Sequence, residues 1–324
     1  TQSRSSAASD VYKRQDINDV AAGLTDYDEA TLLEGQFNDT QYGIPVDMNG
    51  YGVFYNKDVF EENNIEIPKT LSELKAVCET LQEKGITPFG APFSESWCTI
   101  QYISVPNYII SISKDKNWFV DKMNLSSSFA DDAGFKEAMQ ILKDFAPYYG
   151  DDPFATTWND TLSGLATGEV AMTVNGSYTI AGVTSINPDA RIGAFAFPTS
   201  EDPSGAVVVM KPGSSFCVYN SSDADKVAAA KGFLSFLTSE EAAVQFVELT
   251  SGITAHRVDT KTVEGIDDIN AYTGDSVYVN AAVTEFSMEY LVAEYEQIVS
   301  YLMGGIADTD ELAKKLDEAF ATIE

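Results

Sequence analysis

Two patterns of polar and apolar positions predict surface helices. The segment from Thr70 to Glu73 reads TLSE, a capping box in which the threonine hydroxyl and the glutamate carboxylate accept hydrogen bonds from exposed helix amides. A stripe of apolar residues follows with helical spacing, and its members are Leu71, Leu74, Val77, Cys78 and Leu81. Because Gly85 is a favourable helix stop, the pattern predicts one helix from Thr70 to Gly85 that packs on a sheet.

The same device recurs later in the chain. The segment from Thr238 to Glu241 reads TSEE and precedes apolar positions that end at Gly252, which predicts a helix directly after another one at about 223–237. Two further segments, at about 283–303 and 308–323, predict the closing helices.

Short apolar runs between these helices predict strands. They lie at 52–55, 86–89, 170–174, 192–197 and 206–210. Because strands alternate with helices, the expected fold class is α/β with largely parallel sheets, and neither a sandwich nor a bundle fits.

Length and composition indicate the size of the fold and the number of its domains. The chain has 324 residues, of which 44% are apolar, so it can bury a core and is long enough for two domains or two lobes. No apolar run approaches the roughly 18 residues of a membrane span, which argues against an integral membrane protein.

The net charge narrows the possible partners. Twenty basic against 50 acidic residues give −30, a field that repels nucleic acid and anionic lipid surfaces. The acidic surplus is expected to be a solvated coat, and recognition through the acidic groups is the alternative.

Reactive side chains give little sign of an enzyme. His256 is the only histidine, no GxSxG motif precedes a serine, and the P-loop, GxGxxG and metal-binding patterns are absent, so we expect no cofactor and no metal. The three cysteines, Cys78, Cys98 and Cys217, are expected to be buried free thiols, with a Cys78–Cys98 bridge as the alternative. A glycosidase carboxylate pair stays open, because such a pair is defined by distance in space.

The first fifteen residues differ from the rest in composition. They hold three basic residues and one acidic residue, and residues 10–15 (DVYKRQ) resemble an adapter used in library preparation. We expect residues 1–15 to be a disordered, non-native tail, and the natural N-terminus to be missing.

Aromatic residues next to strand ends and glycine turns are the candidate binding groups. They are Tyr51, Trp97, Tyr178 and Phe216. Ligand sites in α/β proteins form where strands end in loops, and an aromatic face can pack on the C–H face of a sugar ring. The alternative is that these residues belong to the core.

Four segments in order resemble the extracellular solute-binding proteins of carbohydrate ABC transporters, the family that includes maltose-binding protein. YGIP at 42–45 with GVFYNKDVF at 52–60 is similar to the family's "YGxP … YNKDxF", and IPKTLSEL at 67–74 with KGITP at 84–88 to its "PKTWDEL … KGITP". LATGEVAM at 165–172 with NGSY at 175–178 is similar to "FxxGxAAM … GxW", and FLSFLTSEE at 233–241 to "FLxFLTSxE". Tyr178 stands where the family commonly has a tryptophan that stacks on sugar.

The resemblance implies a two-lobed periplasmic-binding-protein fold with a hinge. It assigns 16–48 and 207–250 to a first lobe, and 49–205 and 251–324 to a second. About a hundred residues that open other family members have no counterpart, so we expect an incomplete first lobe with an exposed apolar patch and poor independent folding.

The function implied is capture of a mono- or oligosaccharide and its delivery to ABC permease subunits, without catalysis. A monomer outside the cell, lipid-anchored or periplasmic, is expected, with its anchor and signal missing. The alternatives are a glycoside hydrolase and a binding protein for a polyamine, metal or peptide. The residues expected to face one cleft between the lobes are Asn49, Tyr51, Trp97, Tyr178, Ser215, Phe216 and Tyr290.

Overall fold

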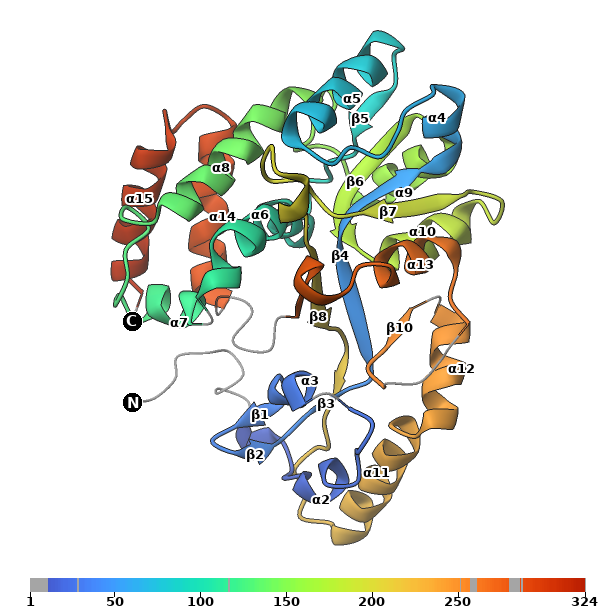
Figure 1. Ribbon diagram of the computed structural model, residues 1–324. Helices are drawn as coiled ribbons and strands as arrows, with labels where there is room; N and C mark the ends of the chain where they lie inside the picture. Colours follow the sequence, from blue (N-terminus) through green and yellow to red (C-terminus); the bar gives the residue numbers. More distant parts are fainter. Residues whose placement is uncertain are drawn as a thin grey trace.

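The chain folds into a larger and a smaller lobe joined by long strands (Figure 1). The computed structural model describes residues 11–27, 29–115, 117–250, 252–256, 261–279, 286 and 288–323. Within these ranges, no helix combines the length and apolar character needed to cross a membrane. The two-lobed α/β architecture expected from the sequence is confirmed.

The strand β4 (Asp47–Asn56) runs through both lobes and organises the main sheet. Its neighbours on either side along its length are β6 (Val170–Gly176), β7 (Ile192–Phe195), β8 (Val208–Pro212) and β10 (Ile253–Thr254). Two outer strands complete the sheet, β5 (Thr87–Phe89) on β6 and β11 (Val277–Val279) on β8.

The direction of these pairings corrects one expectation. All four strands that pair with β4 run antiparallel to it, and only β5 with β6 and β8 with β11 run parallel. The sheet is therefore mixed, and the prediction of largely parallel sheets is wrong. Alternation of strands and helices along the chain does not reveal that one strand pairs with four distant segments.

Helices cover both faces of this sheet. The longer helices of the larger lobe are α5 (Leu71–Glu83), α6 (Ser96–Ile110), α8 (Ala133–Phe145), α9 (Trp158–Thr167), α10 (Tyr178–Ile186), α14 (Met288–Leu302) and α15 (Thr309–Ala321). The shorter ones are α4 (Lys57–Glu62), α7 (Trp118–Met123) and α13 (Glu264–Asn270). Alternate β4 residues separate the layers, because Val53 and Tyr55 join one core and Phe54 the other.

The smaller lobe is built from short elements and two longer helices, α11 and α12. It contains α2 (Asn18–Ala21), α3 (Glu29–Leu33), α11 (Ala224–Leu237) and α12 (Glu240–Thr250). Its two small sheets pair β1 (Gln36–Phe37) with β2 (Thr40–Gln41), and β3 (Ile44–Pro45) with β9 (Ser215–Phe216). Across both lobes, the 3₁₀ turns found in the described residues are η1 (Val11–Lys13), η2 (Ile112–Lys114), η3 (Ala146–Tyr148), η4 (Pro203–Gly205) and η5 (Gly274–Ser276).

Helices start where the capping patterns predict, but some of the capping hydrogen bonds involve a neighbouring residue. The Thr70 hydroxyl accepts from the Glu73 amide at 3.2 Å, but the Glu73 carboxylate accepts from the Lys69 amide at 2.7 Å. Before α12, the Ser239 hydroxyl accepts from the Ala242 amide at 3.3 Å. The cap therefore lies one residue beyond the expected threonine.

The tail expectation fails for the residues that the structure describes. The Gln15 amide donates to the Val218 carbonyl at 2.7 Å, and the Asn220 amide donates to the Lys13 carbonyl at 2.8 Å. Residues 11–15 are therefore paired with 218–220, and the prediction that they are disordered is wrong. Residues 1–10 lie outside the described residues.

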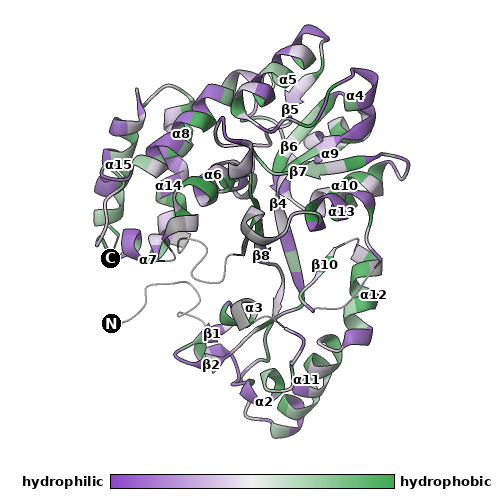
Figure 2. Cartoon of the chain, viewed as in Figure 1, coloured by the Kyte–Doolittle hydropathy of each residue, from purple (hydrophilic) through white to green (hydrophobic). Residues whose placement is uncertain are grey.

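The two lobes bury their apolar surface unequally. The small core cluster of the smaller lobe includes Ile17, Ile44 and Leu234, and Leu234 is the only residue buried on α11. On the same helix Phe233 and Phe236 are 59% and 51% exposed. Figure 2 shows hydrophobic residues along α11 and α12 at the rim of this lobe. This agrees with the expected exposure of apolar side chains there.

Replacing Phe233 and Phe236 together by serine should change the free energy of unfolding by no more than about 0.5 kcal/mol each, because both side chains are exposed. The dye ANS should bind the variant less than the parent chain. The control is Leu234→Ala, which should cost about 3 kcal/mol in urea unfolding because that side chain is buried. A large loss of stability in the double serine variant would contradict this view of α11.

Candidate ligand site at the aromatic cluster

Three aromatic rings from three helix starts form a compact cluster on the larger lobe. Trp97, Trp158 and Tyr178 lie in the first turns of α6, α9 and α10. The ring centroids of Trp97 and Trp158 are 5.4 Å apart, and Tyr178 lies 6.2 Å from each. Trp97 is exposed and the other two rings are half-buried. We call these three residues the aromatic cluster.

Two polar side chains hold the rings of this cluster. Glu95 accepts hydrogen bonds from the Trp97 indole N–H and from the Trp158 backbone amide, both at 2.8 Å. Asn175 Oδ1 accepts from the Tyr178 hydroxyl at 2.5 Å. Hydrogen bonds therefore hold the side chains of Trp97 and Tyr178 and the backbone at Trp158.

The cluster continues onto the long strand through Tyr51. The Tyr51 ring lies 6.4 Å from Tyr178 at a steep angle, and Lys211 Nζ lies 5.1 Å from the centroid of Tyr51. Lys211 is buried on β8 and also lies 5.3 Å from the ring centroid of Tyr108, an arrangement typical of cation–π contacts.

Asn49 lies on the part of β4 that pairs with β8, opposite Lys211. The Ser177 hydroxyl donates to Asn49 Oδ1 at 3.5 Å and accepts from the Gly50 amide at 3.3 Å. Since Ser177 directly precedes Tyr178, Asn49 is joined to the same region as the cluster. The structure therefore gathers four of the seven expected residues, Asn49, Tyr51, Trp97 and Tyr178.

Ser215 and Phe216 lie on the smaller lobe, exposed on β9. A glycine-serine loop precedes Phe216, and its backbone amides could in principle bind a ligand. Instead, the Gly213 amide donates to the Asp47 carbonyl at 2.9 Å and the Ser214 amide to Asp47 Oδ1 at 2.5 Å. These two amides are therefore already bonded to the start of β4.

Tyr290 does not face a cleft, and this expectation is wrong. The side chain is 1% exposed, its hydroxyl donates to the Met123 carbonyl at 3.1 Å, and its ring lies 4.7 Å from Phe320. It lies on α14, where helical periodicity turns it into the core shared with α15.

Trp158 is the site residue that sequence reasoning missed. A capping box starts α9, because the Thr157 hydroxyl accepts from the Asp160 amide and the Asp160 carboxylate accepts from the Thr157 amide. A tryptophan directly after such a cap is held at a helix start. That signal, read together with the other aromatics, could have found it.

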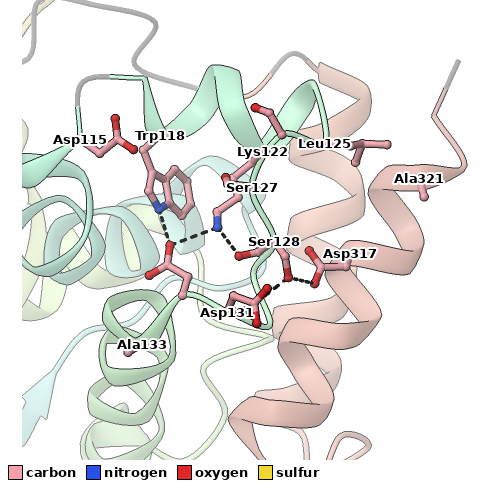
Figure 3. Close-up of a pocket in the computed structure, with 12 residues that line it drawn as sticks. Asp115, Trp118, Lys122, Leu125, Ser127, Ser128, Asp131, Ala133, Asp317 and Ala321 are labelled. Atoms are coloured by element: carbon pink, nitrogen blue, oxygen red, sulfur yellow. Dashed lines mark hydrogen bonds and ion pairs between the residues drawn. The ribbon is translucent and has the colours of Figure 1, made fainter.

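A separate cavity of about 730 Å³ lies between α7, α8 and α15 (Figure 3). Lys122, 2% exposed, donates to the Ser128 carbonyl at 2.6 Å and pairs with Asp132 Oδ2 at 3.2 Å. Asp317 accepts from the Ser128 hydroxyl and the Phe129 amide, both at 2.7 Å. Because these groups bond to one another, they stabilise the packing of α7, α8 and α15. None of the seven expected residues lines the cavity.

Asp132 also makes this corner sensitive to acid. Burial opposes its charged form, but hydrogen bonds from the Phe135 amide and Trp118, with the Lys122 charge, bring the pKa of Asp132 below its ordinary value. A carboxyl with a lowered folded-state pKa stabilises the fold above its unfolded pKa, about 3.9, and loses this contribution as the pH falls through the folded value.

The single histidine and the three cysteines are the reactive side chains considered from the sequence. His256 is buried, and burial lowers the pKa of its imidazole. Cys78 and Cys98 are buried free thiols whose pKa burial raises, so the alternative of a bridge is wrong. Cys217 is also free but exposed, which corrects its expected burial.

No group of histidine, cysteine, aspartate and glutamate side chains able to hold a metal ion occurs in the described ranges.

Two lobes joined by a continuous strand, with an aromatic cluster beside that strand, are features of a ligand-binding protein. A sequence model of the family described as bacterial extracellular solute-binding protein matches residues 3–258. The chain belongs to this family. The match begins within residues 1–15, the segment whose composition differs from that of the rest of the chain.

Three individual proteins illustrate the relationship. The multiple sugar-binding protein of Streptococcus mutans is 28% identical over 184 residues, 54% of this chain and 42% of that protein. Raffinose-bound RafE of Streptococcus pneumoniae superposes with a TM-score of 0.77 at 20% identity, over 96% of this chain and 80% of that one. A Bacillus licheniformis sugar transporter protein in complex with stachyose gives 0.74 at 16% identity, over 95% and 80%. The chain spans about half the length of the curated relatives it matches, or less.

We expect Asp132→Asn to lower the free energy of unfolding by about 3 kcal/mol near neutral pH, because it leaves the Lys122 ammonium buried without its ion-pair partner. The variant should also lose less stability than the parent between about pH 7 and about pH 3. Urea unfolding at both pH values measures this. Asp131→Asn in the same cavity is the control, and equal pH slopes for the parent and Asp132→Asn would contradict the prediction.

Proposed function

We propose that the protein captures a mono- or oligosaccharide and presents it to the permease subunits of an ABC transporter. The observation that carries the proposal is the aromatic cluster, in which Trp97, Trp158 and Tyr178 lie within 6.2 Å of one another beside the strand that joins the lobes. Aromatic rings bind the flat C–H faces of sugars, and neighbouring amides and hydroxyls bind their hydroxyl groups.

The polar groups near the cluster suit a neutral ligand. Asn49 and Ser177 provide an amide and a hydroxyl, and the nearby charges of Glu95 and Lys211 already have contacts within the protein. Family membership and sugar-bound structural neighbours support the same ligand class. The chain is proposed to act outside the cell, in keeping with the family description, and to act as a monomer.

The lobes are proposed to follow the division made from the sequence, with 16–48 and 207–250 on one side, except that Val208 and Val209 of β8 pack in the cores of the larger lobe. Closure of the lobes around a ligand would then bring Ser215 and Phe216 toward the cluster. Tyr290 is not part of this proposal.

The rival functions make different demands on the structure. A glycoside hydrolase needs two carboxyl groups about 5–9.5 Å apart on either side of the scissile bond. At the aromatic cluster the identified carboxylate is Glu95, and it is occupied by two N–H donors. A polyamine or metal carrier needs an acid-lined site. The proposal is therefore of binding without catalysis.

A thermal-shift screen of the full chain against a panel of neutral sugars tests the proposal. A sugar that binds only the folded protein at about 100 times its dissociation constant should add about 2.7 kcal/mol of stability and raise the melting temperature. Spermidine and acidic peptides serve as control ligands. Stabilisation by spermidine and by none of the sugars would favour the rival class.

Replacing either Tyr178 or Trp158 by alanine should weaken the affinity for that sugar by roughly 1–3 kcal/mol, because each change removes one aromatic face. Isothermal titration calorimetry measures the loss. Tyr219→Ala is the control, since Tyr219 is exposed and lies outside the cluster. Unchanged affinity in both cluster variants would show that these rings are structural.

A further inference from the structure

We propose that Glu95 is the positioning residue of the aromatic cluster. Its carboxylate fixes the two tryptophans relative to each other and makes no contact with the ligand. The inference deepens the proposed function and rests on sugar binding at this cluster.

The two hydrogen bonds of Glu95 join elements that are distant in sequence. Oε2 accepts from Trp97 Nε1–H, and Oε1 accepts from the backbone amide of Trp158, which lies 63 residues further along the chain. One bond sets the orientation of an indole ring, and the other sets the position of a helix start. Together they determine how the Trp97 ring meets the Trp158 ring, at 5.4 Å and 72°.

The backbone of Glu95 makes this link rigid. Glu95 is the N-cap of α6, and its carbonyl accepts from the amides of Cys98 at 3.0 Å and Thr99 at 3.2 Å. The same residue therefore begins α6 and holds the start of α9. A carboxylate is favoured between two helix N-termini, because both present partial positive charge.

The hydrogen bonds inside the cluster determine what it can offer to a ligand. The donor of Trp97 is used by Glu95, and the hydroxyl proton of Tyr178 is used by Asn175. The indole N–H of Trp158 donates to no protein atom in the part of the chain that the structure describes. The cluster thus presents ring faces and a single free donor, which fits a pyranose with a flat C–H face and one adjacent oxygen acceptor.

Conservative substitutions separate the position of the rings from the charge of Glu95. Glu95→Gln keeps the size, but its amide group places an N–H donor against one of the two N–H donors. Glu95→Asp keeps the charge, but the shorter side chain cannot span both donors. Both variants should therefore release one tryptophan.

The matched control is Glu201→Gln. Glu201 Oε1 accepts from the backbone amide of Ser72 at 3.0 Å and from its hydroxyl at 2.9 Å, so it too holds the start of a helix on the larger lobe. It contacts none of the cluster residues. Because both bonds go to one oxygen, which glutamine keeps, Glu201→Gln controls for the loss of a carboxylate charge at a helix start.

The test has two readouts on the full chain. Fluorotryptophan labelling gives one fluorine NMR signal for each of the three tryptophans. Without ligand, Glu95→Gln and Glu95→Asp should shift the signals of Trp97 and Trp158 and leave that of Trp118, which donates to Asp132. Sugar affinity, measured by calorimetry with the best sugar of the panel, should fall about tenfold or more in both variants. Glu201→Gln should change neither readout.

Three results would overturn the inference. Unchanged Trp97 and Trp158 signals with weaker binding would mean that Glu95 contacts the sugar itself. Shifted signals with unchanged affinity would mean that the ring arrangement does not control binding. Full affinity in Glu95→Asp would mean that charge, and not position, matters. If no sugar binds the parent chain, the proposed function fails, and the fluorine signals alone decide whether Glu95 positions the rings.

Discussion

Pairing of β4 on both sides along its length is the constraint on which the rest of the structure depends. Four antiparallel partners satisfy its backbone in both lobes, so the strand cannot shift in register without breaking bonds to all of them. Close approach adds to this constraint at Gly52, where a Cβ atom would lie 2.7 Å from the Phe195 carbonyl oxygen. The position of Tyr51 along β4, and so beside the cluster, is therefore fixed.

The edge of the same sheet shows how the fold protects exposed strand groups. At the free edge of β7, one amide in the strand and one directly after it donate to side chains from α13 and from the residues that follow that helix. The Ala194 amide donates to Asp268 and the Ala196 amide to the Tyr272 hydroxyl, each at 3.0 Å. Covering an edge with side-chain acceptors prevents pairing with other chains, and it also keeps β7 against β4.

Local signals in the sequence predicted the parts of the fold that local interactions decide. The caps at Thr70 and before α12, and the apolar runs of β4 to β8, were found because hydrogen bonds and periodicity within a few residues determine them. Strand direction in the sheet was not, because it follows from pairings between segments far apart in sequence.

The candidate site also combines residues that local signals predict with residues that only long-range contacts reveal. Tyr51, Trp97 and Tyr178 lie close together, and aromatics next to strand ends and glycine turns are the local signal that singled them out. Tyr290 was a wrong prediction because its position on α14 faces the core. Glu95 carries no such signal. Its role depends on a bond to Trp158, and only the folded chain brings these residues together.

The charges beside the aromatic cluster are engaged within the protein, although the chain as a whole is strongly acidic. With a net charge of −30, any uncompensated carboxylate at the site would favour cations. Near the cluster, Glu95 is satisfied by two donors and Lys211 lies against two tyrosine rings, so both charges are already engaged within the protein. Acidic groups gather instead at places such as the cavity of about 340 Å³ that His256 shares with Asp26 and Glu240. The cluster is thus the part of this acidic surface where stacking and neutral hydrogen bonds, not charge, would select the ligand.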